Sequence, residues 1–302
     1  MYSLKYIKNV NNFFKDHKIF NKAFNDENKT FIGKKILITG GCGSVGSILA
    51  KKLLEFKKKK LVIIDNNEYS IFRFNRSIPK NKRLDIKFLS ILNKKQLKKN
   101  FLKYNFDIVY NCAAIKHVDI AENNREETYR VNVLGTKNII DMCKVTNVKQ
   151  LIFISTDKAF YPKGVMGRTK LEAEKKILKF KKKNLQTKVL RFPNVLFSSG
   201  SLCEIIHECI NQKKTFFLKN KKLKRYFIFQ ADTVEFILRA TDNINVSNKI
   251  IVLKNVKESK ILDLLIYLKK NFKLNYKVTK LPKFEKVSEI YSDFSSEQKI
   301  YI

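Results

Sequence analysis

Two short segments of the chain carry residue types that could do chemistry. Residues 40–46 (GGCGSVG) hold four of the nine glycines in the chain, and such a turn lets a backbone approach a pyrophosphate closely. Residues 155–158 (STDK) present a hydroxyl, a carboxyl and an amine in succession, which are groups that can hold a substrate and exchange protons with it. Further on, Met166 and Lys170 lie one turn apart on a predicted helix. The sequence therefore indicates a dinucleotide site beside a site for acid–base chemistry.

The glycine segment lies between a predicted strand and a predicted helix. Residues 35–39 are a short apolar run typical of a buried parallel strand, and the apolar spacing of residues 44–56 indicates an amphipathic helix. In that setting Gly40 allows the tight turn after the strand, and Gly46 lets the helix pack closely against it. The start of the helix offers free N–H groups to phosphates. We interpret the segment as a dinucleotide-binding loop.

A carboxylate follows at the position where such folds bind the adenosine ribose. Asp65 ends the next predicted strand, residues 61–65, and can accept hydrogen bonds from both ribose hydroxyls. Asn66 and Asn67 come next, with no arginine to bind a 2′-phosphate. These residues favour NAD as the cofactor, although a nearby lysine could serve NADP.

The same strand and helix alternation continues along the chain. Strands are predicted at residues 107–111, 150–155 and 188–192, with helices at about 127–146 and 166–183. This pattern is typical of an α/β Rossmann-type doubly wound parallel sheet, whose ligands bind at the carboxyl ends of the strands. We expect three parts. They are a helical N-terminal extension (1–33), an NAD(P)-binding Rossmann domain (34–193) and a smaller substrate-binding region interleaved with the last sheet strands (194–302).

The bulk composition argues against other classes of protein. The 63 basic and 27 acidic residues give a formal charge of +36, but the lysines are spread along the whole chain, so we expect solvated faces rather than a nucleic-acid site. Anionic partners such as nucleotide-sugars or a membrane surface remain compatible with this charge. No apolar stretch reaches about 18 residues, and no secretory signal is apparent. The five scattered cysteines predict reduced thiols and no metal site, and we expect a cytoplasmic protein.

Several further segments give the chain a family resemblance. It resembles the polysaccharide-biosynthesis branch of the extended short-chain dehydrogenases, the bacterial UDP-N-acetylglucosamine 4,6-dehydratases. The Thr-Asp-Lys block and the Ala-Ala-x-Lys-His block are fairly specific to this branch. The matching stretches occur in family order, at residues 39–47, 111–118, 132–136, 155–159, 166–170, 191–196, 198–201 and 225–227.

The resemblance implies a three-step reaction on a UDP-sugar, UDP-N-acetylglucosamine or a close relative. C4 of the hexose is oxidised and its hydride passes to the nicotinamide. Water then leaves across C5 and C6, because the new ketone acidifies the C5 proton. The hydride finally returns to C6, which gives a 4-keto-6-deoxy sugar nucleotide for surface glycan synthesis. The resemblance also implies a homo-oligomer.

The resemblance assigns roles to named residues. Asp157 is the acid that protonates the departing hydroxyl, Lys158 is the base for C5, Thr156 holds the C4 oxygen, and Lys170 binds the nicotinamide ribose. The residues expected at the cofactor are Gly40, Gly43, Ser44, Val45, Gly46, Asp65, Asn66, Ala113, Ala114, Lys116, Asn132 and Lys170. The residues expected at the substrate are Lys116, His117, Asn194, Ser201 and Arg225.

The chain departs from the family pattern at Met166, where most short-chain dehydrogenases carry a tyrosine. A methionine cannot accept a proton, so the C4 hydroxyl must lose its proton to another group, such as Asp157, Lys158 or a water. Two alternatives therefore stay open. One is an NAD-dependent nucleotide-sugar epimerase, which needs no Asp-Lys elimination pair, and the other is a catalytically degenerate NAD(P)-binding protein.

Overall fold

A computed structural model of the chain describes residues 2–27, 29–291 and 299–301. Its main body is an eight-stranded sheet in which every neighbouring pair is parallel, in the order β13-β10-β6-β5-β4-β1-β2-β3. The strands are β1 (Lys35–Thr39), β2 (Lys60–Asp65), β3 (Leu84–Phe88), β4 (Ile108–Asn111), β5 (Gln150–Thr156), β6 (Gln186–Phe192), β10 (Lys249–Val252) and β13 (Lys299–Tyr301). The strand order reverses at β1, which lies between β2 and β4. This arrangement confirms the predicted Rossmann-type sheet.

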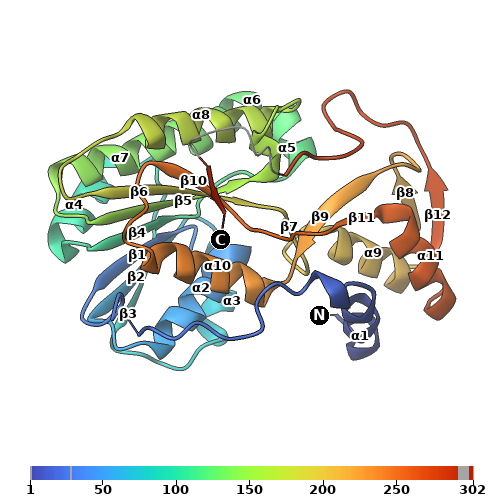
Figure 1. The fold of residues 1–302 in the computed structure, drawn as a ribbon, viewed down its shortest axis with the longest axis horizontal. Helices are drawn as coiled ribbons and strands as arrows, with labels where there is room; N and C mark the ends of the chain where they lie inside the picture. The colour runs from blue at the N-terminus through green and yellow to red at the C-terminus, as the bar shows by residue number, and fades with distance from the viewer. Residues whose placement is uncertain (1, 28, 292–298, 302) are drawn as a thin grey trace.

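Helices cover both faces of this sheet (Figure 1). One face carries α2 (Ser44–Glu55), α3 (Glu68–Arg76) and α10 (Gln230–Asp242), and the other carries α4 (Lys94–Tyr104), α7 (Thr136–Val145) and α8 (Val165–Lys179). Central strand residues such as Leu37, Ile63 and Phe153 are buried in one continuous core. Strands that are apolar on both faces can be buried only in this way.

One predicted helix is divided in the structure. Residues 127–146 were expected to form a single helix, but α6 (Arg125–Tyr129) runs into a π-helical turn (Arg130–Gly135) before α7 begins. The turn contains Asn132, whose side-chain amide hydrogen-bonds with the backbone N–H and C=O of Ile115 and with the hydroxyl of Thr169. Isolated π turns are frequent at functional sites, and this one directs Asn132 toward the chain that follows β4.

A smaller lobe lies at the carboxyl ends of the sheet strands and has its own core. It contains α1 (Leu4–Phe13), a 3-10 turn (Lys15–His17), β7 (Asn194–Val195), α9 (Leu202–Asn211), β8 (Thr215–Leu218), β9 (Lys224–Ile228), β11 (Glu258–Lys260), α11 (Ile261–Asn271) and β12 (Asn275–Val278). Tyr6 and Phe14 of the N-terminal segment are buried here with Ile206, Leu218 and Leu265. The first helix therefore packs into the small lobe (Figure 1). No described helix is long and apolar enough to cross a membrane.

Candidate functional site

A cavity of about 1030 Å³ is lined by both the sheet domain and the small lobe. On the sheet side, its wall comes from the segments that follow β1, β2, β4, β5 and β6. On the other side, its wall comes from residues 198–203 and from β8 and its surroundings. Its volume is at the upper end of the range for small-molecule sites.

The glycine segment forms the end of the cavity beside α2. Gly40 has φ +59°, and a Cβ atom there would lie 2.7 Å from Cα of Ala113. A Cβ atom on Gly46 would collide with the carbonyl oxygen of Gly40. The two glycines thus let the loop, the end of β4 and the first turn of α2 pack against one another. Gly43, Ser44 and Val45 then line the cavity at the start of α2, where free N–H groups attract phosphate.

Asp65 closes the same end of the cavity. Its carboxylate accepts hydrogen bonds from the backbone N–H of Cys42 and of Asn67, each at 3.0 Å. A carboxylate has about four acceptor positions, so two protein donors leave capacity for ribose hydroxyls. Asp65 and Asn66 both line the cavity. Among the described residues, Arg225 is the only arginine in the cavity lining, and it belongs to the small lobe.

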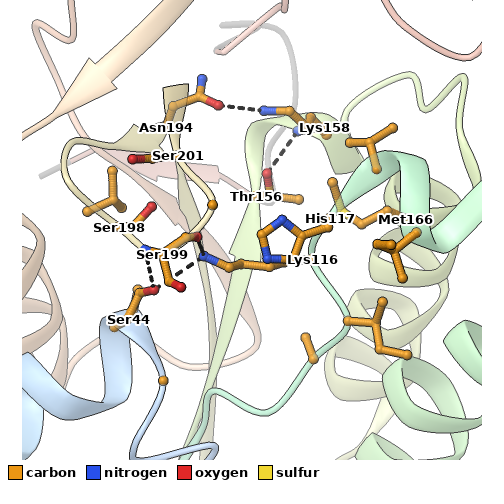
Figure 2. A pocket seen from close by; sticks show the side chains of 18 of the residues that line it. Ser44, Lys116, His117, Thr156, Lys158, Met166, Asn194, Ser198, Ser199 and Ser201 are labelled. Atoms are coloured by element: carbon orange, nitrogen blue, oxygen red, sulfur yellow. Dashed lines mark hydrogen bonds between the residues drawn. The ribbon is translucent and has the colours of Figure 1, made fainter. Parts of the chain in front are cut away.

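Three segments meet where the two lobes touch (Figure 2). The amine of Lys116 donates to the carbonyl oxygen of Ser199 at 2.6 Å and to Oγ of Ser44 at 3.3 Å. The backbone N–H of Ser199 also donates to Oγ of Ser44, at 3.0 Å. The small lobe is therefore tied directly to the first turn of α2. We call this group of Ser44, Lys116 and Ser199 the lobe bridge.

His117 lies beside the lobe bridge and faces the same cavity. Gly200 has φ +66°, and any Cβ atom there would collide with the His117 imidazole. Partial burial and the neighbouring Lys116 amine lower the pKa of His117. Ser201 lines the cavity too, and its hydroxyl caps α9 by accepting from the N–H of Glu204.

Three consecutive residues at the end of β5, Thr156, Asp157 and Lys158, form what we call the polar triplet. Thr156 is the last residue of β5, and residues Asp157–Ala159 form a 3-10 turn. Oδ1 of Asp157 accepts from the Thr156 hydroxyl at 2.8 Å and from the Lys158 amine at 3.1 Å. The Lys158 amine also donates to Oδ1 of Asn194 at 3.1 Å (Figure 2). Thr156, Lys158 and Asn194 all line the cavity.

Two residues expected at the ligands do not reach the cavity wall. Asp157 is 0% exposed, and its Oδ2 has no hydrogen-bond partner within the described part of the chain. Asn132 is 1% exposed, because its amide is used on Ile115 and Thr169. Asp157 is therefore buried behind the part of the cavity wall that Thr156 and Lys158 form. Asn132 supports the chain that leads to Lys116.

Helix α8 contributes two residues to the cavity wall, Lys170 and Met166. The Lys170 amine donates to the carbonyl oxygen of Ile154 at 2.8 Å and lies 4.6 Å from the centre of the Phe153 ring. Burial lowers the pKa of Lys170 to about 8. Met166 is buried next to Ala121 and Val165 and still lines the cavity. The cavity wall also includes Ala113 and Ala114 after β4.

Arg225 is held by the C-terminal segment. Its guanidinium donates to the carbonyl oxygens of Lys224, Lys286 and Val287, and it lies 3.5 Å from Glu285. The Lys286 amine in turn donates to the carbonyl oxygen of Phe160 at 2.7 Å. Sequence reasoning named neither Ser199 nor Lys219 as site residues, and both line the cavity. Ser199 lies within a stretch that matches the family, residues 198–201, but its contacts with Lys116 and Ser44 join distant parts of the chain and have no local signal.

The described residues contain no group of three or more His, Cys, Asp or Glu side chains that could hold a metal ion. The cavity lining includes hydroxyls, amines, amides, a guanidinium and scattered carboxylates. These groups suit phosphates and sugar hydroxyls.

Comparisons with known proteins show the family to which the chain belongs. The family described as polysaccharide biosynthesis protein matches residues 36–291. The chain is 33% identical to a UDP-N-acetylglucosamine 4,6-dehydratase (inverting) of Campylobacter jejuni, over 86% of this chain and 78% of the relative. It is 32% identical to the capsular polysaccharide biosynthesis protein CapD of Staphylococcus aureus, over 76% of this chain. It is 30% identical to a UDP-glucose 4-epimerase of Rickettsia bellii, over 70% of this chain.

Some relatives are considerably longer than the matched region. The chain spans 39% of the length of CapD and 63% of the length of the Rickettsia protein. Among solved structures, the dTDP-glucose 4,6-dehydratase DesIV of Streptomyces venezuelae aligns with a TM-score of 0.78 at 16% identity, covering 85% of this chain and 88% of DesIV. This likeness shows the fold. The chain belongs to the polysaccharide biosynthesis protein family, a branch of the extended short-chain dehydrogenases.

Proposed function

We propose that the protein is a nucleotide-sugar 4,6-dehydratase that acts on UDP-N-acetylglucosamine or a close relative. The observation that carries the proposal is the Lys158 amine, which is shared between Asp157 and Asn194 at the end of β5. Elimination of water needs a base for the C5 proton and an acid for the C6 hydroxyl. A lysine at the cavity wall with a carboxyl directly behind it supplies both groups.

The residues at the glycine end fit NAD. Ser44 and the start of α2 would hold the pyrophosphate, and Asp65 would accept the ribose hydroxyls. Ala113 and Ala114 would lie along the cofactor, with Lys170 near the nicotinamide ribose. No arginine lines that end of the cavity among the described residues, which favours NAD over NADP. When bound, NAD supplies a reversible acceptor for the C4 hydride.

The polar triplet would divide the proton transfers. Lys158 would take the C5 proton, since its amine reaches the cavity wall. Asp157 is buried, so its proton would pass through the Thr156 hydroxyl, which bonds to it at 2.8 Å and does line the cavity. The same pair could accept the C4 proton, a role that Met166 cannot perform. Lys116, His117, Asn194, Ser201 and Arg225 remain the candidates for the UDP-sugar.

The reaction product tests this proposal. Purified protein, supplied with NAD and UDP-N-acetylglucosamine, should yield a nucleotide-sugar that has lost one water and carries a 4-keto group and a 6-methyl group. Mass spectrometry and proton NMR measure both changes. A Lys158→Met variant serves as the matched control, because it should still bind the cofactor and should not release water.

A second candidate is a UDP-sugar 4-epimerase, which the similarity to the Rickettsia protein favours. An epimerase would return a 4-epimer of unchanged mass, and that result would exclude the dehydratase. Binding of NAD without turnover of either kind would instead indicate a catalytically degenerate member of the family.

A further inference from the structure

A buried ion pair lies behind the polar triplet, outside the cavity lining. Nη2 of Arg191 and Oε2 of Glu174 are 2.5 Å apart, and their side chains are 4% and 1% exposed. Nε of Arg191 makes a second bond to Glu174, at 2.9 Å. Removing two charges from water is costly, and a buried pair often stabilises a fold no better than apolar side chains of similar size. The pair therefore calls for an explanation other than stability.

Its contacts join three elements of the site. Glu174 follows Lys170 by one turn of α8 and accepts from the hydroxyl of Ser155 at 2.5 Å. Ser155 precedes Thr156 and lies directly opposite Arg191, across the β5–β6 pair. The ion pair thus connects the helix that carries Lys170 to the strand end that carries the triplet.

The guanidinium also reaches the far end of the turn. It lies 5.6 Å from the centre of the Phe160 ring, and the backbone N–H of Phe160 donates to the carbonyl oxygen of Asp157. The ion pair therefore contacts residues on both sides of Asp157 and Lys158, namely Ser155 and Phe160. Neither charged side chain lines the cavity.

We propose that Glu174 and Arg191 are positioning residues that fix the turn bearing Asp157 and Lys158 relative to Lys170. This inference rests on the proposed dehydratase function for its kinetic test. Without the pair, Lys158 can depart from Asn194 while Lys170 keeps its bond to Ile154. Displacements of about 1 Å in such a site can lower a rate by about a hundredfold.

The main test replaces the whole pair by apolar side chains of similar size. The double variant Glu174→Leu/Arg191→Met should fold and keep its affinity for NAD and its KM within about twofold, while kcat falls by about 10- to 100-fold. A purely structural pair would change the melting temperature and leave kcat at the wild-type value, and that outcome would overturn the proposal. Asp85→Asn, which breaks the Lys60 ion pair at the opposite sheet edge, is the control and should leave kcat unchanged.

Two milder variants cover the case in which the double variant does not fold. Ser155→Ala removes only the hydrogen bond from Ser155 to Glu174. Arg191→Lys keeps the positive charge but cannot make both hydrogen bonds of the guanidinium to Glu174. Both should lower kcat more than they raise KM, with a smaller effect than the double variant. A third variant, Glu174→Gln, should lower the pKa of Lys170, because the Glu174 charge raises that pKa. Any loss of activity caused by deprotonation of Lys170 should then begin at a lower pH. Unchanged kcat in both milder variants would contradict the proposal.

Hydrogen exchange tests the proposal independently of turnover. The backbone N–H groups of Lys158 and Phe160 are bonded within the turn, so loss of the ion pair should speed their exchange while β1 and β2 are unaffected. Unchanged exchange in the turn would overturn the positioning role even in an active enzyme. Faster exchange in the variant, combined with a wild-type protein that produces no 4-keto sugar, would support the positioning role and contradict only the proposed function.

Discussion

The two ends of the cavity are built in different ways. The glycine end is formed by one continuous segment and by Asp65. It requires residues without a side chain, since a Cβ atom on Gly40 or Gly46 would collide with backbone atoms. The triplet end depends on charged and polar side chains from distant segments. Lys158 bonds to Asn194, 36 residues away, and Phe160 receives Lys286, 126 residues away.

The two ends of the cavity should therefore tolerate different substitutions. The glycine end should fail through steric collision when a side chain is added to Gly40 or Gly46. At the triplet end, isosteric substitutions should preserve the local structure but stop the proton transfers. Variants at the two ends should therefore separate cofactor binding from water elimination.

Asp157→Asn should give the largest loss. The amide keeps the shape of the carboxyl but cannot donate an acidic proton, so the rate of water loss should fall by about 10²- to 10⁴-fold. NAD affinity should remain at the wild-type value, as measured by titration of the purified variant. Asp141→Asn is a matched control, because Asp141 pairs with Lys94 and Lys137 away from the cavity. Turnover equal to the wild type in Asp157→Asn would remove this residue from the acid role.

Gly46→Ala should weaken the retention of NAD through steric overlap with Gly40 and Gly41. Forcing a methyl group into such a contact costs about 1–3 kcal/mol, which thermal unfolding would detect. Gly33→Ala is the control for backbone strain alone, since Gly33 has positive φ (+69°), unlike Gly46, and no atom lies within 4 Å of its Cβ position. If both variants retained NAD equally, close packing at the loop would not explain the cofactor site.

The pH profile should show an alkaline limb near pH 8. Burial lowers the pKa of Lys170 to about 8, so its amine is protonated below that pH and neutral above it. If the positive charge near the nicotinamide is needed, kcat/KM should fall as the pH rises through this value. Lys170→Arg should retain its charge and move the limb upward, because arginine stays protonated. A limb that is unchanged in Lys170→Arg would assign it to another group.

Ser44→Ala should have the smallest effect of the four. It removes two hydrogen bonds of the lobe bridge, each worth about 0.5–1.5 kcal/mol. NAD should dissociate a few times faster, as measured by stopped-flow displacement, and the product should be unchanged. Ser47→Ala, one turn further along α2, should dissociate NAD at the wild-type rate. Equal rates in the two variants would show that the bridge does not retain the cofactor.

The sequence was sufficient for the features that arise from local patterns. Apolar runs bounded by glycine or aspartate predicted β1 and the end of β2, and the structure confirms both. The π turn was missed because it depends on the bonds of Asn132 to Ile115 and Thr169 rather than on a helical period. The Glu174–Arg191 pair was missed for a similar reason. Its partners come together only when β5, β6 and α8 are packed.

The lobe bridge also bears on how the chain reaches this structure. It joins Ser199 to Lys116 across 83 residues and to Ser44 across 155 residues. Contacts between such distant residues form late, because the long intervening chain must first be ordered. During synthesis, the glycine loop and Lys116 leave the ribosome well before residue 199. We therefore expect strands β1–β6 of the sheet to assemble first as an open half-site, which the small lobe closes only when most of the chain has been made.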